Sequence, residues 1–132
     1  MGQILLSAVE CAGRSCEPFD GDVAPIYLIN SDGNGMRQIY EGIGVIGDLH
    51  LSPDGTKLTF ADSYGRGVSN VYVLDLISGH AWFLVPDDTS EKVWGPRWVS
   101  NDKLVFIKID GMNSSTFQSN LYLANVDGTQ LQ

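Results

Sequence analysis

Apolar and polar residues alternate along three stretches of the chain that resemble one another. The stretches are IYLINSDGNG (26–35), VYVLDLISGH (71–80) and LYLANVDGTQ (121–130), and each has a tyrosine at its second position. Alternation with a period of two, in segments rich in β-branched and aromatic residues, predicts β-strands. Each stretch then runs into Asp-Gly or Ser-Gly, which tolerate the positive φ of tight turns. We therefore expect three strands, each followed by a turn.

Further strands are expected on either side of these three. The segments ILLSA (4–8), LTFAD (58–62) and LVFIK (104–108) match one another, and MRQIY (36–40) and AWFLV (81–85) follow the first two turns. GDLHLSPDGTKLTF (47–60) also matches GPRWVSNDKLVF (95–106), an alignment that puts Trp98 at the position of His50. Because no segment of helical length has helical apolar spacing, the chain is expected to be all-β.

The repeated unit reads as four antiparallel strands over about 45 to 50 residues, which is the period of a β-propeller blade. We expect a single domain over residues 1–132, with blade units at about 3–41, 47–86 and 94–132. In this interpretation the first unit lacks its inner strand, and the third unit is incomplete at its outer strand.

One part of the repeat is similar to a known family. SPDGTKLTFAD (52–62) followed by NVYVLDLISGHAWFLV (70–85) resembles the TolB-like, WD-like β-propeller repeat. The first unit departs from that pattern by lacking the Ser-Pro-Asp-Gly turn, and the third by lacking its Pro and its turn Gly. The resemblance implies a β-propeller fold and protein–protein interaction in the periplasm or outside the cell.

Three blades are fewer than a closed propeller needs, because propellers typically have four to eight. A row of three leaves two flanks on which repeat units cannot bury their apolar faces. Three interpretations stay open: a partial propeller from a longer chain, half of a six-bladed ring formed by two copies, or a partial propeller docked on another protein. End-to-end joining without closure would instead give a fibre.

Charge narrows the choice of partners. The net charge is −8, and the eight Lys and Arg residues are scattered singly, which argues against nucleic-acid binding. No apolar run approaches the roughly 20 residues of a membrane-spanning helix, so no membrane insertion is expected. The first residues lack the basic region of a signal peptide. The expected partner is a protein or a second copy of the chain.

Two cysteines, Cys11 and Cys16, lie in the loop-like segment CAGRSC. Four intervening residues can form a small turn that brings the two sulfurs together, and a disulfide would suit an oxidising compartment. Two unpaired thiols are the alternative. The pair is compatible with a periplasmic or extracellular location.

Two motifs suggest ligands but lack the required context. GIGVIG (42–47) matches G-x-G-x-x-G, yet a strand and a turn follow it where a dinucleotide site needs a helix. FDGDVAP (19–25) places Asp20 and Asp22 near a glycine, which makes them the first choices if a metal binds, although the segment reads as a turn. No cofactor and no catalytic residue are expected, since hydrolase and metalloprotease motifs are absent from the sequence.

Five residues are the candidates for contact with a partner or ligand. His50 lies on an expected inner strand, which borders the central channel of a propeller. A hydrogen-bonded structural role is its alternative. Trp94 is expected in the connector before the matching strand and Trp98 on that strand, with core packing as the alternative for both. Asp20 and Asp22 complete the set. The long loops expected at 11–25, 64–69 and 110–119 are further contact surfaces.

Together these features predict a noncatalytic TolB-like β-propeller scaffold that binds proteins and self-assembles or belongs to a larger propeller. Two alternatives remain. The chain could be a gating propeller segment of a prolyl-oligopeptidase-type serine peptidase or a propeller lyase, or it could be a structural subunit of a fibre-like assembly.

Overall fold

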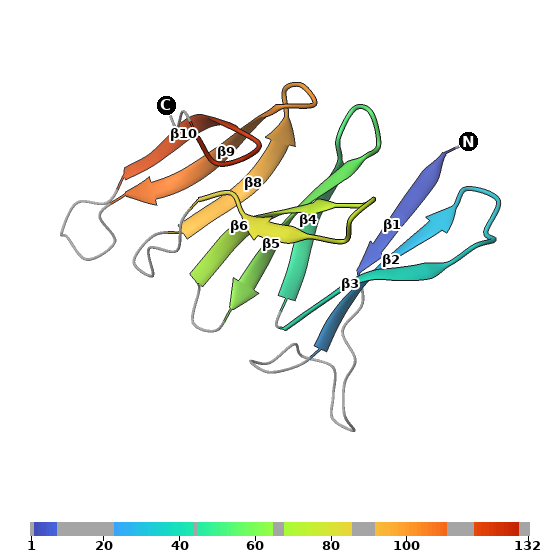
Figure 1. Cartoon of the computed structure of the whole chain (residues 1–132). Helices are drawn as coiled ribbons and strands as arrows, with labels where there is room; N and C mark the ends of the chain where they lie inside the picture. Colours follow the sequence, from blue (N-terminus) through green and yellow to red (C-terminus); the bar gives the residue numbers. More distant parts are fainter. Residues whose placement is uncertain are drawn as a thin grey trace.

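The computed structural model describes residues 2–7, 23–43, 45–64, 68–85, 92–110 and 118–129. These residues form three antiparallel sheets that stand side by side in a row (Figure 1). The first sheet contains β1 (Gln3–Ser7), β2 (Val23–Asn30) and β3 (Arg37–Ile43). The second contains β4 (Val45–Leu51), β5 (Lys57–Tyr64), β6 (Val68–Asp75) and β7 (Ala81–Phe83). The third contains β8 (Lys92–Trp98), β9 (Lys103–Asp110) and β10 (Gln118–Asn125). The predicted all-β fold is therefore confirmed.

Neighbouring strands follow chain order within each sheet, as they do in a propeller blade. One hydrogen bond recurs in all three sheets and fixes the equivalent positions. A backbone N–H in the turn donates to the carbonyl just before β1, β5 or β9: Ser31 to Gly2 at 2.9 Å, Leu76 to Thr56 at 3.0 Å and Val126 to Asp102 at 2.8 Å. In the described part of the chain, the first sheet has no counterpart of β4 and the third has no counterpart of β7.

The Ser-Pro-Asp-Gly turn between β4 and β5 is held by one carboxylate. The Asp54 Oδ1 atom accepts hydrogen bonds from Ser52 Oγ at 2.6 Å, Thr56 N at 3.0 Å and Thr56 Oγ1 at 2.9 Å. These bonds, led by that from Ser52, lower the pKa of Asp54 to about 2. Gly55 takes a φ of 71°, in the left-handed region that favours glycine. The motif thus satisfies most of its own polar groups at a tight bend, and Asp54 N–H donates to Asn101 Oδ1 of the third sheet at 3.1 Å.

The first core lies between the first and second sheets. Phe60 is fully buried at its centre, with its ring centroid 4.8 Å from that of Tyr40 and 5.2 Å from that of Tyr72. Alternation along β5 and β6 directs Phe60 and Tyr72 to the same face of the second sheet, and Tyr40 of β3 packs against them from the first sheet. The other buried members of this core are Ala24, Ile26, Ile46, Leu58 and Leu74.

The second core lies between the second and third sheets and uses the opposite face of β6. Phe106 and Leu104 of β9 are fully buried here, and they pack near Val73, which is also fully buried. The remaining buried members are Val71, Leu84, Val93 and Ala124. Both faces of the middle sheet are therefore covered, whereas each outer sheet has one face with no neighbouring sheet among the described residues.

The predicted segment boundaries differ from the structure in places. Most of GIGVIG is strand, because β3 ends at Ile43 and β4 begins at Val45. Strands β4 and β5 follow it, where a dinucleotide fingerprint has a helix. Parts of the expected loops are also strand, since β2 begins at Val23, β6 at Val68 and β10 at Gln118. Over the described ranges, no helix is long and apolar enough to cross a membrane.

Candidate functional site

The inner strands β4 and β8 align one residue away from the match expected from sequence. His50 pairs with Thr59, and Arg97 pairs with Val105. Thr59 and Val105 are equivalent, since they lie two residues after Lys57 and Lys103, where β5 and β9 begin. Arg97 therefore occupies the position of His50, and the expected equivalence of Trp98 with His50 is wrong.

A bulge in each inner strand explains this shift. Register breaks between Gly47 and His50 in β4 and between Trp94 and Arg97 in β8. Within these bulges, Asp48 has a φ of 52° and Gly95 a φ of 65°, so these two residues are equivalent. Sequence alignment through the two glycines, 47 and 95, misses this because a non-glycine residue adopts the left-handed conformation in β4.

His50 lies between the second and third sheets and is partly exposed. Its side chain shares a face with Thr59, which is fully buried. Burial lowers the pKa of His50, the positive charge of Arg97 lowers it further, and the negative charge of Asp48 opposes the shift. Arg97 and Asp48 are 3.9 Å apart and about half exposed, a geometry that contributes about 0–1 kcal/mol.

The lowered pKa of His50 gives a pH dependence of stability. In the unfolded chain His50 takes up its proton near pH 6.5, before the folded protein does. Its contribution is therefore fully present above about pH 6.5 and is lost as pH falls through the lower folded pKa. We expect His50→Gln to flatten the fall in unfolding free energy below pH 6.5, as measured by urea denaturation from pH 5 to pH 8. His80→Gln, at the exposed histidine, is the matched control. A His50→Gln profile that is parallel to wild type would contradict the expectation.

The two candidate tryptophans lie in strand β8. Trp98 is half-buried, packs against the second core, and donates from Nε1 to the His50 carbonyl at 2.9 Å. Its packing agrees with the core role given as the alternative for Trp98, and the hydrogen bond also joins the second sheet to the third. The expected place of Trp94 in a connector is wrong, because Trp94 pairs with Ile107 inside β8.

Four other predicted residues lie outside the described residues: Asp20, Asp22, Cys11 and Cys16. Their proposed roles in contacts and in a disulfide stay predictions. Within the described ranges, no three His, Cys, Asp or Glu side chains gather into a group that could hold a metal ion.

The outer face of the third sheet carries a row of apolar side chains. Register places Val105 opposite Leu123 and Ile107 opposite Leu121, on the face turned away from the second sheet. Leu121 is 70% exposed, a large exposed fraction for a leucine in the middle of a strand, here the edge strand β10. Val99, just after β8, is 59% exposed. These five residues, Val99, Val105, Ile107, Leu121 and Leu123, are called the third-sheet flank below.

The outer face of the first sheet is also apolar, and the charged side chain described on it is acidic. Alternation along β2 turns Val23, Tyr27 and Ile29 away from the first core, and Val23 is 36% exposed. Glu41 lies on the same face, because it pairs with Pro25 of β2. Among the described side chains of β2 and β3 on this face there is no Lys or Arg. Val23, Tyr27, Ile29 and Glu41 are called the first-sheet flank below.

One sequence feature indicates the third-sheet flank. The segment LVFIK (104–108) is apolar at four consecutive positions, whereas a half-exposed strand alternates. Continuous apolar runs are typical of strands buried on both faces. The run therefore predicts that the outer face of the third sheet is apolar as well.

The chain is similar in fold to solved β-propellers. It matches TolB from Acinetobacter baumannii with a TM-score of 0.63 and 15% identity, over 83% of this chain and 26% of that one. It matches the β-propeller domain of the Trilobed protease from Pyrococcus furiosus with a TM-score of 0.67 and 14% identity, over 98% of this chain and 38% of that one. A variant of the AtxE2 isopeptidase with Astexin3-dC4 bound gives a TM-score of 0.70 and 10% identity, over 98% of this chain and 27% of that one.

These matches confirm the predicted likeness to TolB and to other propeller domains. The chain spans between about a quarter and two-fifths of the length of these proteins. No protein-family model matches the chain, and no curated protein sequence matches it.

Proposed function

We propose that this chain is a noncatalytic protein-interaction scaffold of the TolB-like propeller type, and that its three blades close a ring with those of a second copy. The observation that carries the proposal is the pair of apolar flanks on the outer sheets. Leu121 of β10 is 70% exposed, whereas Val71, at the matching position of β6, is 1% exposed. Exposed apolar surfaces of this kind mark interaction sites.

The third-sheet flank and the first-sheet flank are complementary in charge, whereas two copies of the same flank would bring like charges together. Lys92 and Lys103 pair with Ile109 and Asn125, which places both lysines on the outer face of the third sheet at its two ends. Glu41 lies on the first-sheet flank. Contact between the third-sheet flank of one copy and the first-sheet flank of the other thus brings opposite charges around an apolar centre.

Two such contacts, related by a two-fold axis through the centre of the ring, cover all four flanks of the two copies. Closed symmetry of this kind stops growth at two chains, whereas the same contact without closure would propagate. A ring of six blades falls within the range of four to eight in known propellers. A longer chain that supplies further blades is the alternative, and it is consistent with matches that cover only 26% to 38% of TolB and the Trilobed protease propeller domain.

Hydroxyl-radical footprinting tests whether the flanks are covered in solution. We expect Leu121 to be protected at protein concentrations where the chain is assembled and to become reactive on dilution. Ile77 is the matched control, because it is 85% exposed in the turn after β6 and lies on neither flank. If Leu121 is as reactive as Ile77 at every concentration, the flanks are not covered by a second copy.

A second candidate function is supported by the likeness to peptidase propellers. The Trilobed protease and the AtxE2 isopeptidase both contain regions of this fold, so the chain is alternatively a gating propeller segment of a serine peptidase. A periplasmic or extracellular location belongs to the first proposal and rests on the predicted bridge between Cys11 and Cys16. Labelling of the native full-length protein by a fluorophosphonate probe for active serines would favour the peptidase.

A further inference from the structure

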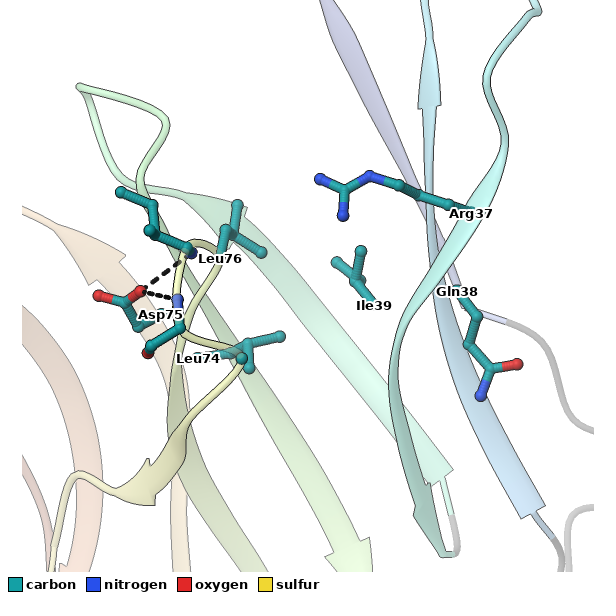
Figure 2. Close-up of a pocket in the computed structure, with 9 residues that line it drawn as sticks. Arg37, Gln38, Ile39, Leu74, Asp75 and Leu76 are labelled. Atoms are coloured by element: carbon teal, nitrogen blue, oxygen red, sulfur yellow. Dashed lines mark hydrogen bonds between the residues drawn. The ribbon is translucent and has the colours of Figure 1, made fainter.

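A pocket lies between the first two sheets, near the outer end of their contact. Its volume is about 250 Å³, and it is bordered by β3 on one side and by the turn after β6 on the other (Figure 2). Arg37 and Ile39 project from β3 into the space facing this turn (Figure 2). On the opposite side, Asp75 Oδ1 accepts hydrogen bonds from the N–H groups of Ile77 at 2.9 Å and Ser78 at 2.8 Å.

The same place between the second and third sheets is occupied by Trp82. Arg37 pairs with Leu28, the residue after the repeated Tyr27. Trp82 pairs with Val73, the residue after the repeated Tyr72. Arg37 and Trp82 therefore stand at equivalent positions, each on the outer strand of its sheet and each facing the turn of the next sheet.

The indole of Trp82 fills the space between the second and third sheets. Its Nε1 atom donates to the Val126 carbonyl at 2.9 Å, and its ring packs against the second core. Val126 and Leu76 are equivalent, because their N–H groups make the hydrogen bond that recurs in every sheet. In the described part of the chain, however, no donor bonds to the carbonyl of Leu76 and Arg37 forms no ion pair.

Backbone spacing also differs between the two turns, in which Gly79 lies three residues after Leu76 and Gly128 two residues after Val126. A Cβ atom added to Gly128 would lie 2.5 Å from the Leu84 carbonyl oxygen, so the turn of the third sheet closes against the second sheet. A Cβ atom added to Gly79, in the turn that borders the pocket, would meet no atom within 4 Å. The first contact is therefore open where the second is filled.

We propose that this pocket binds the indole ring of a tryptophan side chain on a protein partner. The ring takes the place that Trp82 fills in the next contact, and its N–H donates to the Leu76 carbonyl. Ile39 and Leu74 supply an apolar surface, and the Arg37 guanidinium stacks on the ring as a cation–π contact. Asp75 on the lining and the net charge of −8 disfavour a carboxylate in this place. This inference rests on the proposed scaffold function only in taking the indole from a protein.

A neutral probe tests the pocket without any partner. N-acetyl-tryptophanamide is titrated into the ¹⁵N-labelled chain and followed by NMR. We expect saturable shifts of the amides of Arg37, Ile39 and Leu76 with a Kd of about 1 mM, a typical affinity for one small group. The N1-methyl analogue is expected to bind about fivefold more weakly, because it lacks the donor. Absence of saturable shifts, or equal affinity of the two probes, overturns the proposal.

Variants at Arg37 and Met36 test whether the probe binds in this pocket and not elsewhere on the surface. Arg37→Trp supplies the ring from the chain itself and is expected to abolish probe binding and to raise Tm by about 2–5 °C. Met36→Trp, at an adjacent position that is 62% exposed and does not line the pocket, is expected to leave the Kd unchanged. If Arg37→Trp fails to fold, Arg37→Leu keeps the pocket open and is expected to weaken binding about threefold through loss of the cation.

Probe binding that persists in folded Arg37→Trp overturns the proposal, as does unchanged affinity in Arg37→Leu. The pocket and the ring can fail separately. A dimer that does not bind the probe contradicts only the pocket, and a monomer that binds it contradicts only self-association.

Discussion

Replacing Phe60 with alanine is expected to lower the free energy of unfolding by about 3–5 kcal/mol. Phe60 is fully buried between the first two sheets, with the rings of Tyr40 and Tyr72 within 4.8 Å and 5.2 Å of it, centroid to centroid. Removing the ring leaves a cavity into which the surrounding close-packed core relaxes only in part. Urea denaturation at a fixed protein concentration measures the loss.

Phe83→Ala is the matched control for this prediction. Phe83 also contacts Tyr72, with ring centroids 4.5 Å apart, but it is 40% exposed at the end of a short outer strand. We expect it to cost about 1 kcal/mol or less, because a half-exposed ring leaves no closed cavity. Equal losses for the two variants would show that the first two sheets do not share a packed core.

Replacing Leu121 with aspartate is expected to raise the dissociation constant of the proposed dimer by about 30-fold or more. The substitution puts a charge at the centre of the third-sheet flank, where ring closure would bury it without a partner. The single chain should still fold, since Leu121 is 70% exposed in it. Sedimentation equilibrium measures the constant, and circular dichroism checks the fold.

Ile77→Asp is the control for the charge itself. Ile77 is even more exposed, at 85%, but it lies in a turn and on neither flank. It is expected to leave the dissociation constant unchanged. If both variants weaken association equally, added negative charge and not the flank is responsible.

The strands and the type of fold were predictable because the pattern that specifies them is local. Period-two alternation around Tyr27, Tyr72 and Tyr122 places these tyrosines in β2, β6 and β10. The Ser-Pro-Asp-Gly turn was equally predictable, since most of its hydrogen bonds join residues at most five positions apart, the exception being that from Asp54 N to Asn101 Oδ1. Local chemistry of this kind can be read without knowing what packs on the strand.

The positions that matter for a site depended on register, which local pattern does not specify. A bulge shifted Trp98 away from the position of His50, because Asp48 adopts a φ of 52° that sequence rarely predicts for a non-glycine residue. The match of Arg37 with Trp82, by contrast, follows from the aligned segments MRQIY (36–40) and AWFLV (81–85), because the two hairpins have the same length. What needs the structure is the contact: Trp82 donates to the turn of the third sheet, whereas a pocket lies beside Arg37.

Closure of the ring by a second copy is tested most directly by the molar mass in solution. Light scattering on a sizing column, over a wide range of concentrations, measures it without a label or a variant. We predict a mass that levels off near twice the 14.4 kDa of one chain as concentration rises, because two sets of three blades use all four flanks. A mass that stays near 14.4 kDa at every concentration, or one that climbs past twice that value, would contradict closure of a ring by two copies.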